Sequence, residues 1–121
     1  MTKKLKRLKR KKLNVNSGLY YCNENEDLYF EILDTVLDES QEKKELLERW
    51  AANSDFVGYY REAHALKNVT ATIGADSFNE YLSDLCSEMK ATNKFPPPAK
   101  IKSVMKQYTK LLKIIEKSKK Y

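Results

Sequence analysis

The sequence predicts an all-α protein, an antiparallel four-helix bundle with an additional N-terminal helical segment. Two observations lead to this prediction. The 121-residue chain contains only three glycines and three prolines, and the prolines are consecutive, so residues that break helices are scarce. Apolar residues recur at spacings of three and four, whereas sustained alternation and Asn-Gly or Asp-Gly hairpin turns are absent. The length indicates one domain, and the 41% of hydrophobic residues suffices for one modest core.

The first helical element is predicted to begin near residue 25. Asn23 or Asn25 can cap it, and the acidic residues that follow suit the positive end of the helix dipole. A second helical segment leads to Trp50. Between the two, residues 38–40 (Asp-Glu-Ser) either break the chain or merely bend it, and the pattern is compatible with both. The first apolar stripe consists of Leu28, Ile32, Leu33, Val36 and Leu37.

Three further helices are predicted after residue 52. Capping residues at 53–55 open the first, and Gly74 is expected to end it in the left-handed conformation. The next helix begins at residues 75–77, and the last follows the loop 93–98, with Pro97 or Pro98 in its first turn. The apolar stripes are Phe56, Tyr60, Ala63, Leu66, Thr70 and Ile73, then Phe78, Tyr81, Leu82, Leu85 and Met89, and finally Ile101, Val104, Met105, Tyr108, Leu111, Leu112 and Ile115.

Charge is distributed unevenly along the chain. Residues 1–12 carry a net charge of +8 and residues 99–121 carry +7, whereas residues 13–98 carry −9. Self-repulsion in the first segment predicts a basic, disordered arm or linker over residues 1–15, and the folded domain is expected over 16–121. Because the expected folded centre is acidic, we expect no nucleic-acid partner. The alternative is that the basic ends contact nucleic acid, an acidic partner or a membrane surface.

Several functional classes are disfavoured by what the sequence lacks. No glycine-rich loop of the kind that binds nucleotides is present. The only cysteine and histidine residues are Cys22, Cys86 and His64, fewer than a zinc site needs, so neither metal nor cofactor is expected. The two cysteines are predicted to be reduced thiols of a cytoplasmic protein. No apolar run is long enough for a membrane span. The basic N-terminus is not followed by the apolar region of a signal peptide, so no signal peptide is predicted.

His64 is the only histidine and the one candidate for chemistry. On an ideal helix it lies about 100° from Ala63, at the edge of the core stripe and partly facing water. A neutral imidazole is a nucleophile near neutral pH, and a neighbouring ammonium and amide can stabilise phosphoryl oxygens. Spacing alone is also compatible with an ordinary surface histidine. The residues on the same helix face are Tyr60, Lys67, Asn68 and Ala71.

A longer pattern connects His64 with a known family. Residues 63–68 read Ala-His-Ala-Leu-Lys-Asn, residues 72–75 read Thr-Ile-Gly-Ala, and Leu82 and Leu85 follow. This arrangement resembles the histidine phosphotransfer (HPt) domain family. Residues 18–22, 26–29 with Leu33, and 55–60 are similar to upstream parts of such domains, so the resemblance covers residues 16–115.

The resemblance implies a phosphorelay intermediate without an ATP site of its own, a phosphocarrier more than an enzyme. His64 would accept a phosphoryl group from a receiver-domain aspartate and pass it to another receiver. Lys67 and Asn68 would stabilise the phosphoryl oxygens, and Tyr60, Arg61 and Ala71 would belong to the docking surface. The partners would be receiver domains of response regulators or hybrid histidine kinases, which supply the metal and most catalytic groups. A monomer in the cytoplasm is expected.

Two residues depart from the family pattern. Asn68 replaces the glycine or other small residue usual after the lysine, and it is expected to tune partner choice or slow transfer. Cys86 replaces a Gln or Glu on the neighbouring helix, and it is expected to be a small buried hydrophobic residue. These departures leave an alternative open, a non-phosphorylated helical module that docks on a receiver or kinase without chemistry.

Overall fold

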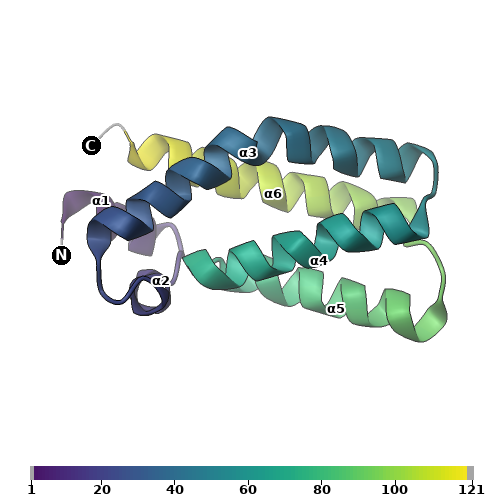
Figure 1. Cartoon of the computed structure of the whole chain (residues 1–121), viewed down its shortest axis with the longest axis horizontal. Helices are drawn as coiled ribbons and strands as arrows, with labels where there is room; N and C mark the ends of the chain where they lie inside the picture. Colours follow the sequence, from purple (N-terminus) through teal and green to yellow (C-terminus); the bar gives the residue numbers. More distant parts are fainter. Residues whose placement is uncertain (1, 120–121) are drawn as a thin grey trace.

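The computed structural model describes residues 2–119, and these residues form six helices and no strands. The all-α prediction is therefore confirmed. Figure 1 shows α3 and α6 along one side of an elongated molecule, α4 and α5 along the other, and α1 and α2 at one end. The helices are α1 (Lys3–Arg10), α2 (Val15–Tyr21), α3 (Glu26–Ala52), α4 (Phe56–Ile73), α5 (Asp76–Thr92) and α6 (Pro98–Ser118).

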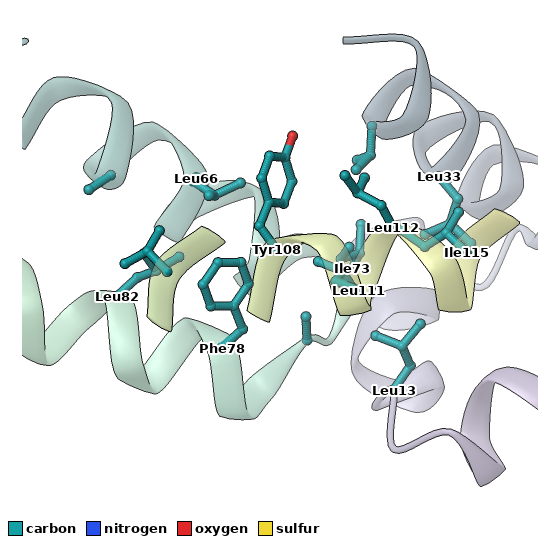
Figure 2. Close-up of a cluster of buried hydrophobic side chains, with 14 of the residues drawn as sticks. Leu13, Leu33, Leu66, Ile73, Phe78, Leu82, Tyr108, Leu111, Leu112 and Ile115 are labelled. Carbon is teal, nitrogen blue, oxygen red and sulfur yellow. The ribbon is translucent and has the colours of Figure 1, made fainter. Parts of the chain in front are cut away.

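The four longer helices pack in the manner of a bundle. Helix α4 contacts both α3 and α5, and α6 contacts α3 and α5. Most residues of the predicted apolar stripes supply the buried core or pack against it, but Leu28, at the start of α3, is 40% exposed. Figure 2 shows residues of several helices gathered around α6, where Tyr108 and Ile115 are 1% and 0% exposed. The labelled neighbours come from α3 (Leu33), α4 (Leu66 and Ile73), α5 (Phe78 and Leu82) and the α1–α2 loop (Leu13).

Helix boundaries follow the capping residues in the sequence. The side chain of Asn25 accepts a hydrogen bond from the backbone N–H of Leu28 at 3.1 Å, and α3 begins there. Asp55 caps α4 in the same way. Gly74 ends α4 with φ 83°, in the left-handed region that glycine adopts without strain. Helix α6 begins at Pro98, as expected for a proline in a first turn.

Helix α3 runs without interruption for 27 residues, so residues 38–40 do not break the chain. None of these residues is glycine or proline, and Asp, Glu and Ser each cost well under about 1 kcal/mol in a helix interior. Ser40 donates its hydroxyl hydrogen to the carbonyl of Leu37 at 2.6 Å, which satisfies the side chain inside the helix. The two predicted segments are thus one helix.

The structure corrects the expectation of a disordered arm over residues 1–15. Residues 3–10 form helix α1, which packs against α6 and α2. Leu5 and Leu8 are 1% and 0% exposed, and burying each contributes about 2 kcal/mol. The ammonium of Lys4 also lies 5.7 Å from the centre of the Phe30 ring. Repulsion between exposed charges is screened by water and salt, so two leucines at i and i+3 outweigh it.

Because α1 packs on α2 and α6, the predicted boundary at residue 15 does not separate an arm from the folded domain. Leu13 and Val15 are 3% and 1% exposed and belong to the same core as the four longer helices. The additional N-terminal helical segment therefore consists of both α1 and α2. Met1, Lys120 and Tyr121, which lie at the ends of the two predicted regions, fall outside the described residues.

Candidate functional site

Helix α4 holds His64 at the edge of its buried stripe. Ala63 and Leu66 on the core side are 0% and 1% exposed, whereas His64 is half-buried. The predicted orientation of the imidazole is therefore confirmed. The side chain of His64 is therefore partly accessible to an approaching molecule.

An aromatic row runs along α4 and leads to His64. The rings of Phe56 and Tyr60 are parallel within 1°, with centroids 6.3 Å apart. The next centroid distance, from Tyr60 to the imidazole of His64, is 5.8 Å with a tilt of 31°. These residues are four positions apart, so their side chains lie one above the other on the helix. The row restricts the imidazole on its N-terminal side, and Tyr60 acts as a support as well as a candidate docking residue.

Beneath Lys67, a polar network joins α4 to α5. The amide nitrogen of Asn79 donates to the carbonyl of Lys67 at 2.7 Å and to the hydroxyl of Thr70 at 3.3 Å. Thr70, which is fully buried, donates its hydroxyl hydrogen to the same carbonyl at 2.8 Å. The backbone one turn after His64 is thus held from both helices. No local pattern indicated Asn79, because its partner Lys67 lies 12 positions away across a turn.

Cys86 lies on α5, where the positive charge of Lys67 influences the pKa of its thiol. The thiol is 3% exposed, and burial raises its pKa above the ordinary value, while the ammonium groups of Lys67 and Lys90 oppose that rise. The thiol is therefore mainly protonated at neutral pH. Cys86 is the buried small residue that the sequence predicted, and it offers no charged group to His64.

The outer side of α4 carries the other predicted site residues. Lys67 and Ala71 are half-buried, whereas Arg61 and Asn68 are exposed. All share α4 with His64, and Lys67 and Asn68 follow it at i+3 and i+4. Lys67 supplies a cation and Asn68 an amide donor on the histidine side of the helix. This arrangement can stabilise negative oxygens on a group attached to the imidazole.

The C-terminal end of α4 is fixed by contacts with the N-terminal part of the chain. The backbone N–H of Asn14 donates to the carbonyl of Gly74 at 2.7 Å. Tyr29, which is fully buried, donates its hydroxyl hydrogen to the carbonyl of Ile73 at 2.8 Å. A carbon atom added at Gly74 would lie 2.1 Å from the carbonyl oxygen of Asn14, so only glycine fits at that position.

Across residues 2–119, no three His, Cys, Asp or Glu side chains are grouped so that they could hold a metal ion. None of the described helices combines the length and apolar character that crossing a membrane requires.

Comparisons with family models, curated proteins and solved structures found no match to this chain.

Proposed function

We propose that this chain is a phosphorelay intermediate of the histidine phosphotransfer type. His64 accepts a phosphoryl group from an aspartyl phosphate on one receiver domain and passes it to an aspartate on another. The observation that supports this best is the half-buried His64 with Lys67 and Asn68 at i+3 and i+4 on the same helix. The proposal includes an antiparallel arrangement of α3, α4, α5 and α6 as a four-helix bundle, and a monomer in the cytoplasm.

The proposed step is a reversible displacement at phosphorus. A ring nitrogen of His64 attacks the phosphorus atom, the bond between phosphorus and the aspartate oxygen breaks, and the aspartate leaves as a carboxylate. The product carries a nitrogen–phosphorus bond, and the second receiver reverses the step. Lys67 and Asn68 stabilise the phosphoryl oxygens, and the receiver supplies the metal and most of the catalytic groups.

Three structural features favour this role. The aromatic row and the Asn79 network limit movement of the helix segment that carries the nucleophile. Small side chains at Ala65 and Ala71 leave space beside the imidazole for a receiver surface. Arg61 extends the positive charge of this face toward an acidic partner site.

Transfer of label from receiver domains tests the proposal. A panel of purified receivers is phosphorylated with radioactive acetyl phosphate, freed of the donor and mixed with the 121-residue chain. The wild-type chain should gain label that is stable to base and labile to acid, as expected of a phosphorylated imidazole. His64→Gln should gain none. The matched control Tyr60→Phe keeps the aromatic row and should be labelled. Equal label on His64→Gln would refute the assignment.

The same experiment distinguishes the docking module that the sequence left open. The exposed amide of Asn68 stands where the family pattern has a small residue, so it could favour binding over transfer. Association with a receiver on a sensor surface, together with no label on the wild-type chain, would favour the docking module. Asn68→Gly should then restore transfer if the bulk of Asn68 is the obstacle.

A further inference from the structure

The two basic ends of the sequence meet on one folded surface. Helix α1 packs against α6, and a groove of about 400 Å³ lies at their junction. Figure 1 shows α1 beside the C-terminal end of α6. We call this site the basic groove. The described residues that line it are Arg7, Arg10, Lys11, Lys12, Lys110, Lys113, Ile114 and Lys117.

The described lining of the basic groove contains no acidic residue. A neighbouring hollow of about 830 Å³ is lined, among described residues, by Lys3, Lys6, Arg7, Lys9 and Arg10, so the positive surface continues along α1. The ion pairs found among residues 2–119 involve other lysines, at positions 43, 100 and 119. The other described cations of the groove form none of these pairs, so their charge is available to an external anion; they are Arg10, Lys11, Lys12, Lys110, Lys113 and Lys117.

An extended polyanion fits the groove better than a bilayer does. The apolar side chains of α1, Leu5 and Leu8, are buried in the protein and cannot insert into lipid. Among residues 2–119, the exposed large hydrophobic residues are Tyr20, Tyr21, Leu28 and Val57, and none of these four belongs to α1 or α6. A concave surface with cations on both walls also suits a strand, which can enter it, more than a plane of headgroups.

An acidic protein partner is disfavoured by the same lining. Protein interfaces depend on a central apolar cluster that excludes water, and Ile114 is the single apolar residue among those described around the groove. Lys110, Lys113 and Lys117 follow one another by about 4.5 and 6 Å along the axis of α6. This row of three cations can therefore neutralise several phosphates of one nucleic-acid strand, which follow one another by about 3.4 Å along the axis of a duplex.

We propose that the basic groove binds the phosphodiester backbone of single-stranded nucleic acid without sequence preference. No aromatic side chain is found among the described lining residues, so base stacking contributes little and phosphate contacts dominate. The acidic remainder of the chain repels the strand and confines it to this end. The proposal is independent of the role of His64, and it revises the expectation of no nucleic-acid partner, which assumed that the basic ends lay outside the folded surface.

Fluorescence anisotropy with a labelled 20-nucleotide single strand of mixed sequence tests the proposal. We expect the 121-residue chain to bind at 50 mM NaCl. Its affinity should fall as salt rises, with a log–log slope of about −3, as for four or five neutralised phosphates. Lys113→Glu/Lys117→Glu should weaken binding roughly ten-fold or more. A matched control, Lys94→Glu/Lys102→Glu, changes the net charge equally at exposed positions outside the groove, and it should bind within about two-fold of wild type.

Other outcomes would overturn the proposal. These are absence of binding at 50 mM NaCl, equal loss in both variant pairs, or tighter binding to phosphatidylserine vesicles or polyglutamate at equal anion concentration. Circular dichroism shows whether each variant keeps its helices. If the charge reversal disrupts α6, Lys113→Gln/Lys117→Gln replaces it, with Lys94→Gln/Lys102→Gln as its control, and a measurable weakening confined to the groove pair is then required.

Discussion

The histidine face of α4 and the basic groove both present cations to anions, but they are built differently. His64, Lys67 and Asn68 lie within five positions on one helix, and Lys67 is half-buried. The groove joins side chains from positions 7–12 and 110–117, most of them exposed. The first arrangement is local and partly buried, and it suits one small group held in a defined position. The second is distributed and exposed, and it suits an extended charge.

This difference predicts different sensitivity to salt. Exposed charges are screened strongly at physiological ionic strength, where the Debye length is about 8 Å, whereas half-buried charges are screened less. Binding of a nucleic-acid strand to the groove should therefore weaken steeply with added salt, whereas phosphotransfer at the histidine face should slow little. The two surfaces can be separated by mutation and by ionic strength alike.

Testing each variant in both assays separates the histidine face from the basic groove most clearly. His64→Gln should lose all transferred label, because no other imidazole is present, yet bind the single strand like wild type. Lys113→Glu/Lys117→Glu should be labelled at the normal rate while its strand affinity falls roughly ten-fold. If His64→Gln also loses strand binding, the two regions are one site and the comparison fails.

Removing the anchor of α1 should damage the groove through the core. Leu8 is 0% exposed, so Leu8→Ala should lower the free energy of unfolding by about 3 kcal/mol. Urea denaturation followed by circular dichroism measures this loss. Because α1 forms one wall of the groove, strand affinity should fall as well, while labelling of the folded fraction at His64 persists.

The neighbouring residue provides the control for Leu8. Lys9 is exposed on the same helix, and Lys9→Ala should change the free energy of unfolding by less than about 0.5 kcal/mol. Equal free energies of unfolding for the two variants would mean that α1 is not docked on α6 in solution. The basic groove would then not exist, and it could not explain any binding of a single strand.

The sequence predicted local features well and distant juxtapositions poorly, for a physical reason. The caps at Asn25 and Asp55, the stop at Gly74 and the orientation of His64 depend on neighbours within one or two turns, and periodicity reports them. The docking of α1 depends on Leu5 and Leu8 meeting α6 about a hundred positions later. The run of like charges around the two leucines predicts disorder, and only the packing of α1 on α6 shows that their burial outweighs the repulsion.

Gly74 connects the two regions, because it ends α4 against Asn14 of the α1–α2 loop. Gly74→Ala should cost about 2 kcal/mol or more of unfolding free energy, from positive φ and the contact with the Asn14 carbonyl. Asn93, at the left-handed end of α5, already carries a Cβ, so Asn93→Ala should cost less than about 1 kcal/mol. Thermal denaturation of both variants measures the difference. Similar losses would show that the Asn14 contact adds nothing.

Lys67 tests whether the histidine face acts as a local site. Lys67→Ala should slow phosphotransfer roughly ten-fold, equivalent to about 1.4 kcal/mol, since one charge-assisted contact to the phosphoryl oxygens is lost. Stability should be nearly unchanged, because the Asn79 and Thr70 hydrogen bonds reach the backbone carbonyl of Lys67 and not its ammonium.

Lys90 is the matched control, because its ammonium also acts on Cys86 but it belongs to α5 and not to the histidine helix. Lys90→Ala should transfer the phosphoryl group at the wild-type rate. Lys67→Arg should recover part of the rate that Lys67→Ala loses, because the guanidinium restores the positive charge but differs from the ammonium in shape. The ratio of wild-type to Lys67→Ala rates should hold between 50 and about 300 mM NaCl, because a half-buried cation is weakly screened. A ratio that collapses toward one as salt rises would show that Lys67 acts only through the general field of the face, as the lysines of the basic groove do.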